Sequence, residues 1–208
     1  MTKRLRVAFL AGLGLLLVFW TLAYRYWQYA RPEGSGPAGP AVAREPFQDV
    51  WTDQSVLLLG VGDSVTAGFG ARLGHSYFDL LARNPDDEFD DMKGLCLSAV
   101  MRNLQVSNIA VSGSTSLRHL EILENDLAIQ NPTLRGLVVM TSGGNDLIHD
   151  YGRRPPREGA MYGATLEQAG PWIENFRIRL ERMLDLLDEK FPGGCDIFLA
   201  DIYDPSDG

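Results

Sequence analysis

The chain has few cysteines, few histidines and a deficit of positive charge. Its 208 residues include two cysteines and three histidines, and 27 acidic residues outnumber 19 basic ones. Cys96 and Cys195 could pair in an oxidising compartment or lie apart as small apolar groups, and their spacing does not decide between the two. The histidines, His75, His119 and His149, form no ligand-spaced cluster with carboxylates, so the sequence indicates no metal site.

Two glycine-rich phosphate-binding patterns are also missing. No predicted strand is followed by Gly-x-x-x-x-Gly-Lys-Ser/Thr or by Gly-x-Gly-x-x-Gly. Residues 32–208 carry a formal charge of −13, and such a field opposes contact with nucleic acid or anionic lipid. The remaining composition, 45% hydrophobic and 22% charged, is typical of a globular protein with one domain and an appendage.

The appendage is the amino terminus. After three basic residues, residues 7–24 run without a charge, and aromatic residues follow them. As a helix this run measures about 27 Å, enough for a bilayer core. We expect residues 1–30 to be an uncleaved membrane anchor with the rest of the chain outside the cytoplasm, although Arg25 and Arg31 weaken that orientation. A cleaved signal peptide and a buried helix are the alternatives. The proline- and glycine-rich residues 31–50 are expected to be a flexible linker.

Apolar runs and helical periodicity alternate through residues 51–208. The runs predict buried strands at residues 55–60, 106–111, 136–141 and 196–202, and the helical periods lie at residues 77–83, 92–104, 117–129 and 172–190. This alternation predicts an α/β fold, a parallel sheet with helices on both faces. Sites in such folds form at the carboxyl ends of the strands.

A polar turn containing glycine follows each of the first three predicted strands, at residues 62–68, 112–115 and 142–146. A single turn of this kind more often has only a structural role, but three of them in this order predict a functional site. Ser64 is the candidate nucleophile, because acyl transfer requires a hydroxyl on a tight turn. The backbone N–H groups of Ser64 and Gly113 and the side-chain amide of Asn145 are the candidate oxyanion hole.

At these turns the chain resembles the SGNH hydrolases, also called the GDSL esterase/lipase family. The matching blocks are Gly-Asp-Ser at residues 62–64, Gly113 at the end of residues 108–113, and Gly-Gly-Asn-Asp at residues 143–146. The resemblance implies a three-layer flavodoxin-like fold over residues 51–208. It also implies serine-dependent ester hydrolysis without a cofactor, with Ser64, Gly113 and Asn145 as the catalytic residues. Asp63 would stabilise the turn.

One part of the family pattern is missing. The resemblance implies a general base on a histidine three residues after an aspartate, beyond a fifth strand, and no such motif follows the fourth predicted strand. His149 has this spacing from Asp146, but Asn145 must point into the oxyanion hole from the same segment. His75 and His119 are expected to be structural. We therefore interpret the chain as truncated at its carboxyl end.

The leading hypothesis is an exported or membrane-anchored ester hydrolase of the bacterial envelope. Its substrate would be a small-molecule, glycan or lipid ester. The alternative is a non-catalytic binding module, or an inactive fragment, with the same fold and no base. Residues 150–171 are expected to form a lid or binding loop, whose Arg153, Arg154 and Arg157 would either recognise an anionic substrate group or pair locally with Glu158.

Overall fold

The computed structural model describes residues 3–26, 41–148, 155–161 and 163–202. It divides into two compact units, Met1–Ala41 and Val42–Gly208. The first unit contains α1, Lys3–Arg25, so the predicted apolar run is helical. Within it, Arg4–Arg25 is long and apolar enough to cross a membrane by length and composition, a test that a signal sequence also passes.

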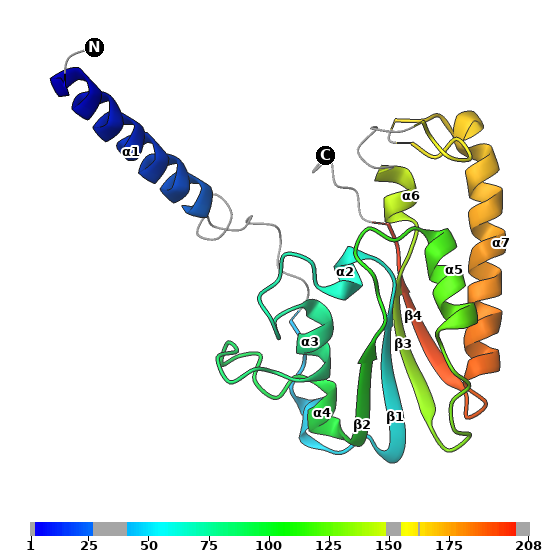
Figure 1. Cartoon of the computed structure of the whole chain (residues 1–208). Helices are drawn as coiled ribbons and strands as arrows, with labels where there is room; N and C mark the ends of the chain where they lie inside the picture. The colour runs from blue at the N-terminus through cyan, green and yellow to red at the C-terminus, as the bar shows by residue number, and fades with distance from the viewer. Residues whose placement is uncertain (1–2, 27–40, 149–154, 162, 203–208) are drawn as a thin grey trace. The chain divides into compact units, whose positions relative to one another are not determined.

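The second unit is built on a four-stranded parallel sheet, which confirms the predicted fold class (Figure 1). The strand order across the sheet is β2-β1-β3-β4. The strands are β1, Thr52–Val61; β2, Met101–Asn108; β3, Arg135–Thr141; and β4, Cys195–Ala200. Because all four run in the same direction, the turns after β1, β2 and β3 lie at one edge of the sheet.

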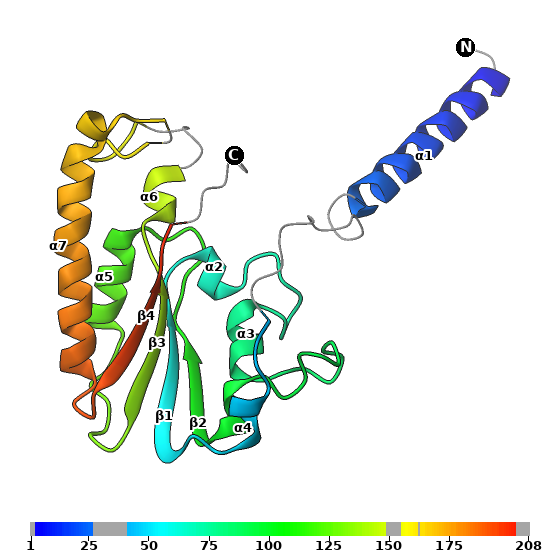
Figure 2. The same ribbon diagram turned by 180° about the vertical axis from the view of Figure 1, so that it is seen from behind.

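Helices cover both faces of this sheet (Figures 1 and 2). One face carries α3, Tyr77–Ala82, and α4, Leu97–Val100, while the other carries α5, Ser116–Asn125, and α7, Leu166–Lys190. Two short helices follow strand ends: α2, Ser64–Ala67, after β1, and α6, Gly144–Ile148, after β3.

Alternation along β1 creates the two cores. Leu57, Leu59 and Val61 pack with side chains of α5 and α7, whereas Leu58 packs with side chains of α3 and α4. Successive side chains of a strand point to opposite faces, and the apolar run of β1 therefore supplies both layers. Burial of β1 on both faces fixes its register, and with it the place where its terminal turn emerges.

The second strand differs from the prediction. It begins at Met101 instead of residue 106, and the predicted helix over residues 92–104 is reduced to α4. β2 is an edge strand with a polar, largely exposed sequence, which hides the apolar signal of a buried strand. Residues 109–111 still follow β1, because Ile109 N–H and Val111 N–H donate to the carbonyl oxygens of Gly60 and Gly62 at 2.9 and 2.8 Å.

The last helix begins earlier than predicted, so the predicted loop over residues 150–171 is too long. Thr165 caps α7 in a capping box with Gln168, and the helix then continues through Pro171. The predicted helix began after Pro171 because proline usually marks a helix boundary. Within this helix Trp172 is buried and Ile173 is exposed.

The second unit starts within the predicted linker over residues 31–50. The 3₁₀ helix η2 spans Glu45–Gln48, and Trp51 N–H donates to the Val100 carbonyl oxygen at 2.8 Å. Arg44 donates to the carbonyl oxygens of Asp90 and Lys93 at 3.0 and 3.2 Å. Residues 44–51 are therefore attached to the domain. Both cysteines are free thiols.

Candidate active site

Hydrogen bonds join the three predicted turns at the carboxyl edge of the sheet. The Ser114 hydroxyl, next to Gly113 in the second turn, donates to the Gly62 carbonyl oxygen in the first turn at 3.1 Å. The Asn145 side-chain amide in the third turn donates to the Ser114 carbonyl oxygen at 2.9 Å. The turns that carry Ser64, Gly113 and Asn145 are thus in direct contact. Each residue that makes these hydrogen bonds is a candidate residue or lies within two residues of one.

Ser64 is the first residue of α2, and Asp63, the residue before it, caps the amino end of this helix. The Asp63 carboxylate accepts a hydrogen bond from Val65 N–H at 3.0 Å and another from the Thr141 hydroxyl at 3.1 Å. An aspartate at this position satisfies an N–H group that has no partner within the helix. Because Asp63 is only 4% exposed and both bonds are structural, its position fits the expected turn-stabilising role.

A chain of hydroxyl groups leads to that carboxylate. Tyr77 and Thr66 lie 2.7 Å apart through their hydroxyl oxygens, and Thr66 and Thr141 lie 2.9 Å apart. Asp63 can only accept, so Thr141 donates to it, Thr66 donates to Thr141, and Tyr77 donates to Thr66. Burial raises the pKa of Tyr77, against the opposing effect of its hydrogen bond with Thr66, and so keeps its hydroxyl protonated.

Two further residues shape the first turn. Gly62 has φ = +135°, and a Cβ at this position would lie 2.3 Å from the Thr141 carbonyl oxygen. Only glycine permits β1 and β3 to approach this closely at their ends. Asn108, at the end of β2, donates from its side-chain amide to the Thr66 carbonyl oxygen at 2.7 Å and so holds α2 against the second strand.

Gly113 is the third residue of a four-residue turn that closes when Ser114 N–H donates to the Val111 carbonyl oxygen at 3.1 Å. Its φ of +80° favours glycine, whereas a Cβ built there would meet nothing within 4 Å. Glycine is therefore required by the backbone conformation and not by crowding. In the part of the chain that the structure describes, the Gly113 N–H has no hydrogen-bond acceptor, and it remains available to a substrate.

Asn145 lies half-buried in α6. Its side-chain amide carries two hydrogens, and one of them is used in the bond to the Ser114 carbonyl oxygen. Among the described residues, no second acceptor contacts this amide. The bond to Ser114 fixes the rotamer of Asn145 relative to the Gly113 turn, so the two candidate oxyanion donors are held by a shared contact.

Asp146, the neighbour of Asn145, caps α5 from outside that helix. Its carboxylate accepts from Ser116 N–H at 2.8 Å and from the Ser116 hydroxyl at 2.6 Å. Thr115, the residue before α5, makes no side-chain cap of its own. The Trp172 indole N–H in α7 also donates to Asp146, at 3.3 Å. Asp146 therefore ties the third turn to α5 and α7.

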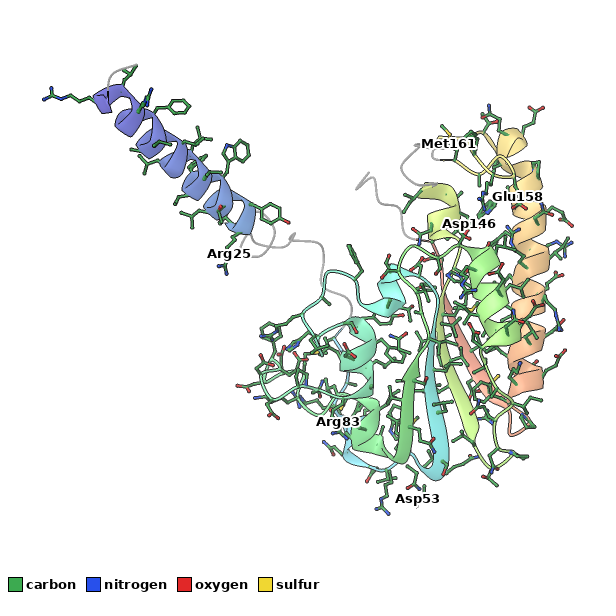
Figure 3. All side chains as sticks on the ribbon, viewed as in Figure 1. Arg25, Asp53, Arg83, Asp146, Glu158 and Met161 are labelled. Atoms are coloured by element: carbon green, nitrogen blue, oxygen red, sulfur yellow. The ribbon has the colours of Figure 1, made fainter. Side chains whose placement is uncertain are left out.

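Arg179 extends this network to the segment after α6. Its guanidinium donates to the Ser116 hydroxyl at 3.0 Å and to Glu158 at 2.9 and 3.1 Å, and lies 3.8 Å from Asp146. Figure 3 shows Asp146 and Glu158 at the same end of the domain. The hydrogen bond from Arg179 lowers the pKa of Glu158. Glu158 thus pairs with Arg179. Arg153 and Arg154 lie outside the described residues, so their roles stay predictions.

Neither described histidine contacts Ser64. The Nε2 of His75 lies 2.9 Å from Asp87, and its Nδ1 lies 3.1 Å from the Leu73 carbonyl oxygen. His119 is buried in α5, with its ring nitrogens on Ser114 and Ser142. His149 lies outside the described residues. Among the residues that are described, no group of three histidine, cysteine or carboxylate side chains could hold a metal ion.

Comparison with known proteins identifies related sequences and folds. A model of the family described as "GDSL-like Lipase/Acylhydrolase family" matches residues 61–207. No curated protein matches the chain. Among solved structures, it is similar to a lipolytic protein of the G-D-S-L family from Veillonella parvula, with 16% identity, a TM-score of 0.42, and 70% of this chain and 57% of that one covered.

Two further structures are similar at the same level. A protein from Parabacteroides merdae described as a GDSL-like lipase has 22% identity and a TM-score of 0.38, covering 71% of this chain and 59% of that one. A mutant of the esterase AlinE4 has 24% identity and a TM-score of 0.46, covering 74% and 63%. The chain thus spans 57–63% of the length of these three structures.

Proposed function

Because the chain belongs to the GDSL-like lipase/acylhydrolase family, we propose that it is a serine-dependent hydrolase of carboxylic esters. Ser64 is the nucleophile, and Ser64, Gly113 and Asn145 supply the oxyanion hole. The observation that carries this proposal is the pair of hydrogen bonds from Ser114 to Gly62 and from Asn145 to Ser114, at 3.1 and 2.9 Å. These bonds bring the three turns together, which supports a shared site for one substrate carbonyl group.

In the proposed reaction the Ser64 hydroxyl oxygen attacks the ester carbonyl carbon while its proton passes to a general base. The carbonyl oxygen becomes an oxyanion and accepts hydrogen bonds from the Ser64 and Gly113 N–H groups and from the Asn145 amide. The C–O bond to the alcohol then breaks, and the alcohol leaves with the proton. Water hydrolyses the acyl-Ser64 ester and releases the carboxylic acid. No cofactor takes part.

We place the general base on a histidine other than His75 and His119. Both ring nitrogens of each of these residues already have hydrogen-bond partners. The family pattern points to a histidine three residues after an aspartate, and no such motif follows β4 within residues 1–208. His149 has this spacing from Asp146, but Asp146 is engaged with Ser116 and Trp172, and His149 lies outside the described residues.

We further propose that α1 anchors the protein in a membrane and that the domain acts outside the cytoplasm. The length and apolar composition of Arg4–Arg25 support the anchor. The basic residues in the first turn of this helix, before its apolar run, support the orientation, and release after cleavage is the alternative. The proposed substrate is a small-molecule, glycan or lipid ester, in keeping with the family. The charge of −13 over residues 32–208 opposes a nucleic-acid partner.

The test is hydrolysis of short p-nitrophenyl esters by the full-length protein. Ser64→Ala should reduce turnover to the background rate, and Asn145→Ala should lower kcat by about 10² to 10³, the usual effect of losing one oxyanion donor. Asn103→Ala, which removes an exposed asparagine of β2 bonded to the Asp53 carbonyl oxygen, is the matched control and should leave kcat unchanged. Parent-like turnover by Ser64→Ala would refute the proposal.

A non-catalytic binding module is the second candidate. The observation that favours it is that both described histidines are occupied by other partners. In such a module the turns would bind an ester without cleaving it, and Ser64 would be an ordinary hydroxyl. Ester binding without turnover in the full-length protein would support this candidate.

A further inference from the structure

His119 is a buried titratable residue that the proposed reaction does not use. It lies in α5 and is 1% exposed. Its Nε2 is 2.7 Å from the Ser114 hydroxyl oxygen, and its Nδ1 is 2.9 Å from the Ser142 hydroxyl oxygen. Ser114 directly follows Gly113, and Ser142 belongs to the same turn as Asn145. The imidazole therefore spans the two turns that carry the proposed oxyanion donors.

The partners of Ser114 determine where the imidazole proton lies. The Ser114 hydroxyl oxygen is 2.6 Å from the Val111 carbonyl oxygen and 3.1 Å from the Gly62 carbonyl oxygen. Both carbonyl groups can only accept, so the single hydroxyl proton of Ser114 points to them. The oxygen of Ser114 must then accept the third bond. His119 consequently donates through Nε2–H, and its Nδ1 accepts from the Ser142 hydroxyl.

The surroundings favour the neutral form of this ring. Burial lowers the pKa of His119, although the charges of Asp63 and Asp146 act in the opposite direction. A neutral Nε2–H tautomer satisfies each donor and acceptor in the cluster without a buried cation. The arrangement has one consistent set of proton positions, and it fixes the Ser114 and Ser142 side chains together.

We propose that His119 is a positioning residue for the oxyanion hole. It holds the Gly113 turn and the Asn145 turn at a constant separation, so that the Gly113 N–H and the Asn145 amide meet the same oxygen. This inference rests on the proposed ester hydrolysis. Oxyanion stabilisation depends on donors that are held in place before the reaction, and small displacements of such groups slow turnover strongly.

The first test examines the hydrogen bonds of His119 without measuring activity. Nitrogen-15 NMR of the imidazole in the full-length protein at pH 7 should show a protonated Nε2 and an unprotonated Nδ1 for His119. The signal is assigned by its loss in His119→Gln, and His75→Gln serves as the control that leaves it in place. An Nδ1–H tautomer or a cationic ring at pH 7 would overturn the proposed bonding.

The second test separates this inference from the proposed function. His119→Phe fills the space without hydrogen bonds, and it should lower kcat for a short p-nitrophenyl ester about tenfold or more, less than the loss of a donor itself. KM should change much less than kcat, because the ground-state contacts remain. His119→Gln retains a donor for Ser114 and should recover part of the rate, and His75→Gln should behave like the parent.

The outcomes distinguish the two ideas. If Ser64→Ala is inactive but both folded His119 variants turn over at the parent rate, the positioning role is wrong and the proposed function stands. If Ser64→Ala retains the parent rate, both are wrong. Since His119→Phe could fail to fold, circular dichroism of each variant accompanies the kinetics, and His119→Gln alone then decides the result.

Discussion

At the scale of single residues, the Thr141 hydroxyl connects more of the candidate site than any side chain that would touch the substrate. It donates to Asp63 at 3.1 Å, lies 2.9 Å from the Thr66 hydroxyl, and accepts from Asp63 N–H at 3.3 Å. Thr141 is also the last residue of β3. The position of Asp63, which caps α2, depends on this one hydroxyl, and the position of Ser64 depends on it in turn.

Replacement of that hydroxyl should destabilise the domain. Thr141→Val keeps the shape of the side chain but leaves buried groups of Asp63 and Thr66 without a partner, and we expect the free energy of unfolding to fall by about 1–3 kcal/mol. Thr141→Ser keeps the hydroxyl and removes one methyl group, which costs about 0.8 kcal/mol. Urea denaturation at pH 7 measures both. A larger loss for the serine variant would contradict the assignment.

The candidate residues in the three turns were predictable from the sequence, whereas the residues that support these turns were not. Ser64, Gly113 and Asn145 became candidates because polar glycine-containing turns follow three successive strands. Thr141, Ser142 and His119 were not assigned to the site, since their contacts come from tertiary packing and leave no periodic or spacing signal. Asp146 carried a weak signal through its place beside Asn145, but its role in capping α5 required the structure.

At the scale of the elements, α5, α6 and α7 are connected by a partly buried ion network. Arg179 and Asp146 have side chains only 12% and 8% exposed, and Glu158 completes the network from the segment before α7. Gly159 packs so closely on α7 that a Cβ there would lie 1.9 Å from the Gln168 carbonyl oxygen. The segment that contains Glu158 is therefore docked on α7.

Removal of the central cation should loosen this end of the domain. Arg179→Met leaves Asp146 and Glu158 without their shared partner, and we expect a loss of about 2–3 kcal/mol in the free energy of unfolding. Arg177→Met is the matched control on the same helix: Arg177 is 54% exposed and pairs with Glu174 and Glu181, and such surface pairs contribute less than about 1 kcal/mol. Equal losses for the two variants, measured by urea denaturation, would rule out the network as a stabilising element.

The fold was predictable where a strand has an apolar run. β1, β3 and β4 were found because each contains an apolar run bounded by turns, although β4 is an edge strand and largely exposed. β2, the other edge strand, was placed too late because its sequence is largely polar. The start of α7 was missed because the Thr165 capping box outweighs Pro171, a balance that residue preferences alone do not reveal.

At the scale of the whole molecule, the chain combines a basic, apolar amino terminus with an acidic domain. The structure separates these as the units Met1–Ala41 and Val42–Gly208. The described residues that form the cores of the second unit all lie within that unit. The domain should therefore fold without the first unit.

Deletion of residues 1–41 tests this separation. The shortened protein should keep the circular dichroism spectrum of the domain and remain in the supernatant after alkaline extraction of membranes. The parent should sediment with the membranes, because α1 is long and apolar enough to span them. A parent of intact mass that stays in the supernatant would contradict the anchor. A parent that has lost its amino terminus would support the cleaved alternative.

The most direct test of the central claim is covalent labelling of the full-length protein with a fluorophosphonate. An activated Ser64 forms a bond from its oxygen to phosphorus while fluoride leaves, and its proton passes to the base. We predict one label per protein, located on Ser64 by peptide mass spectrometry and absent from Ser64→Ala. A folded protein in which Ser64 stays unlabelled, or in which Ser64→Ala is labelled equally, would contradict the assignment of Ser64 as a catalytic nucleophile.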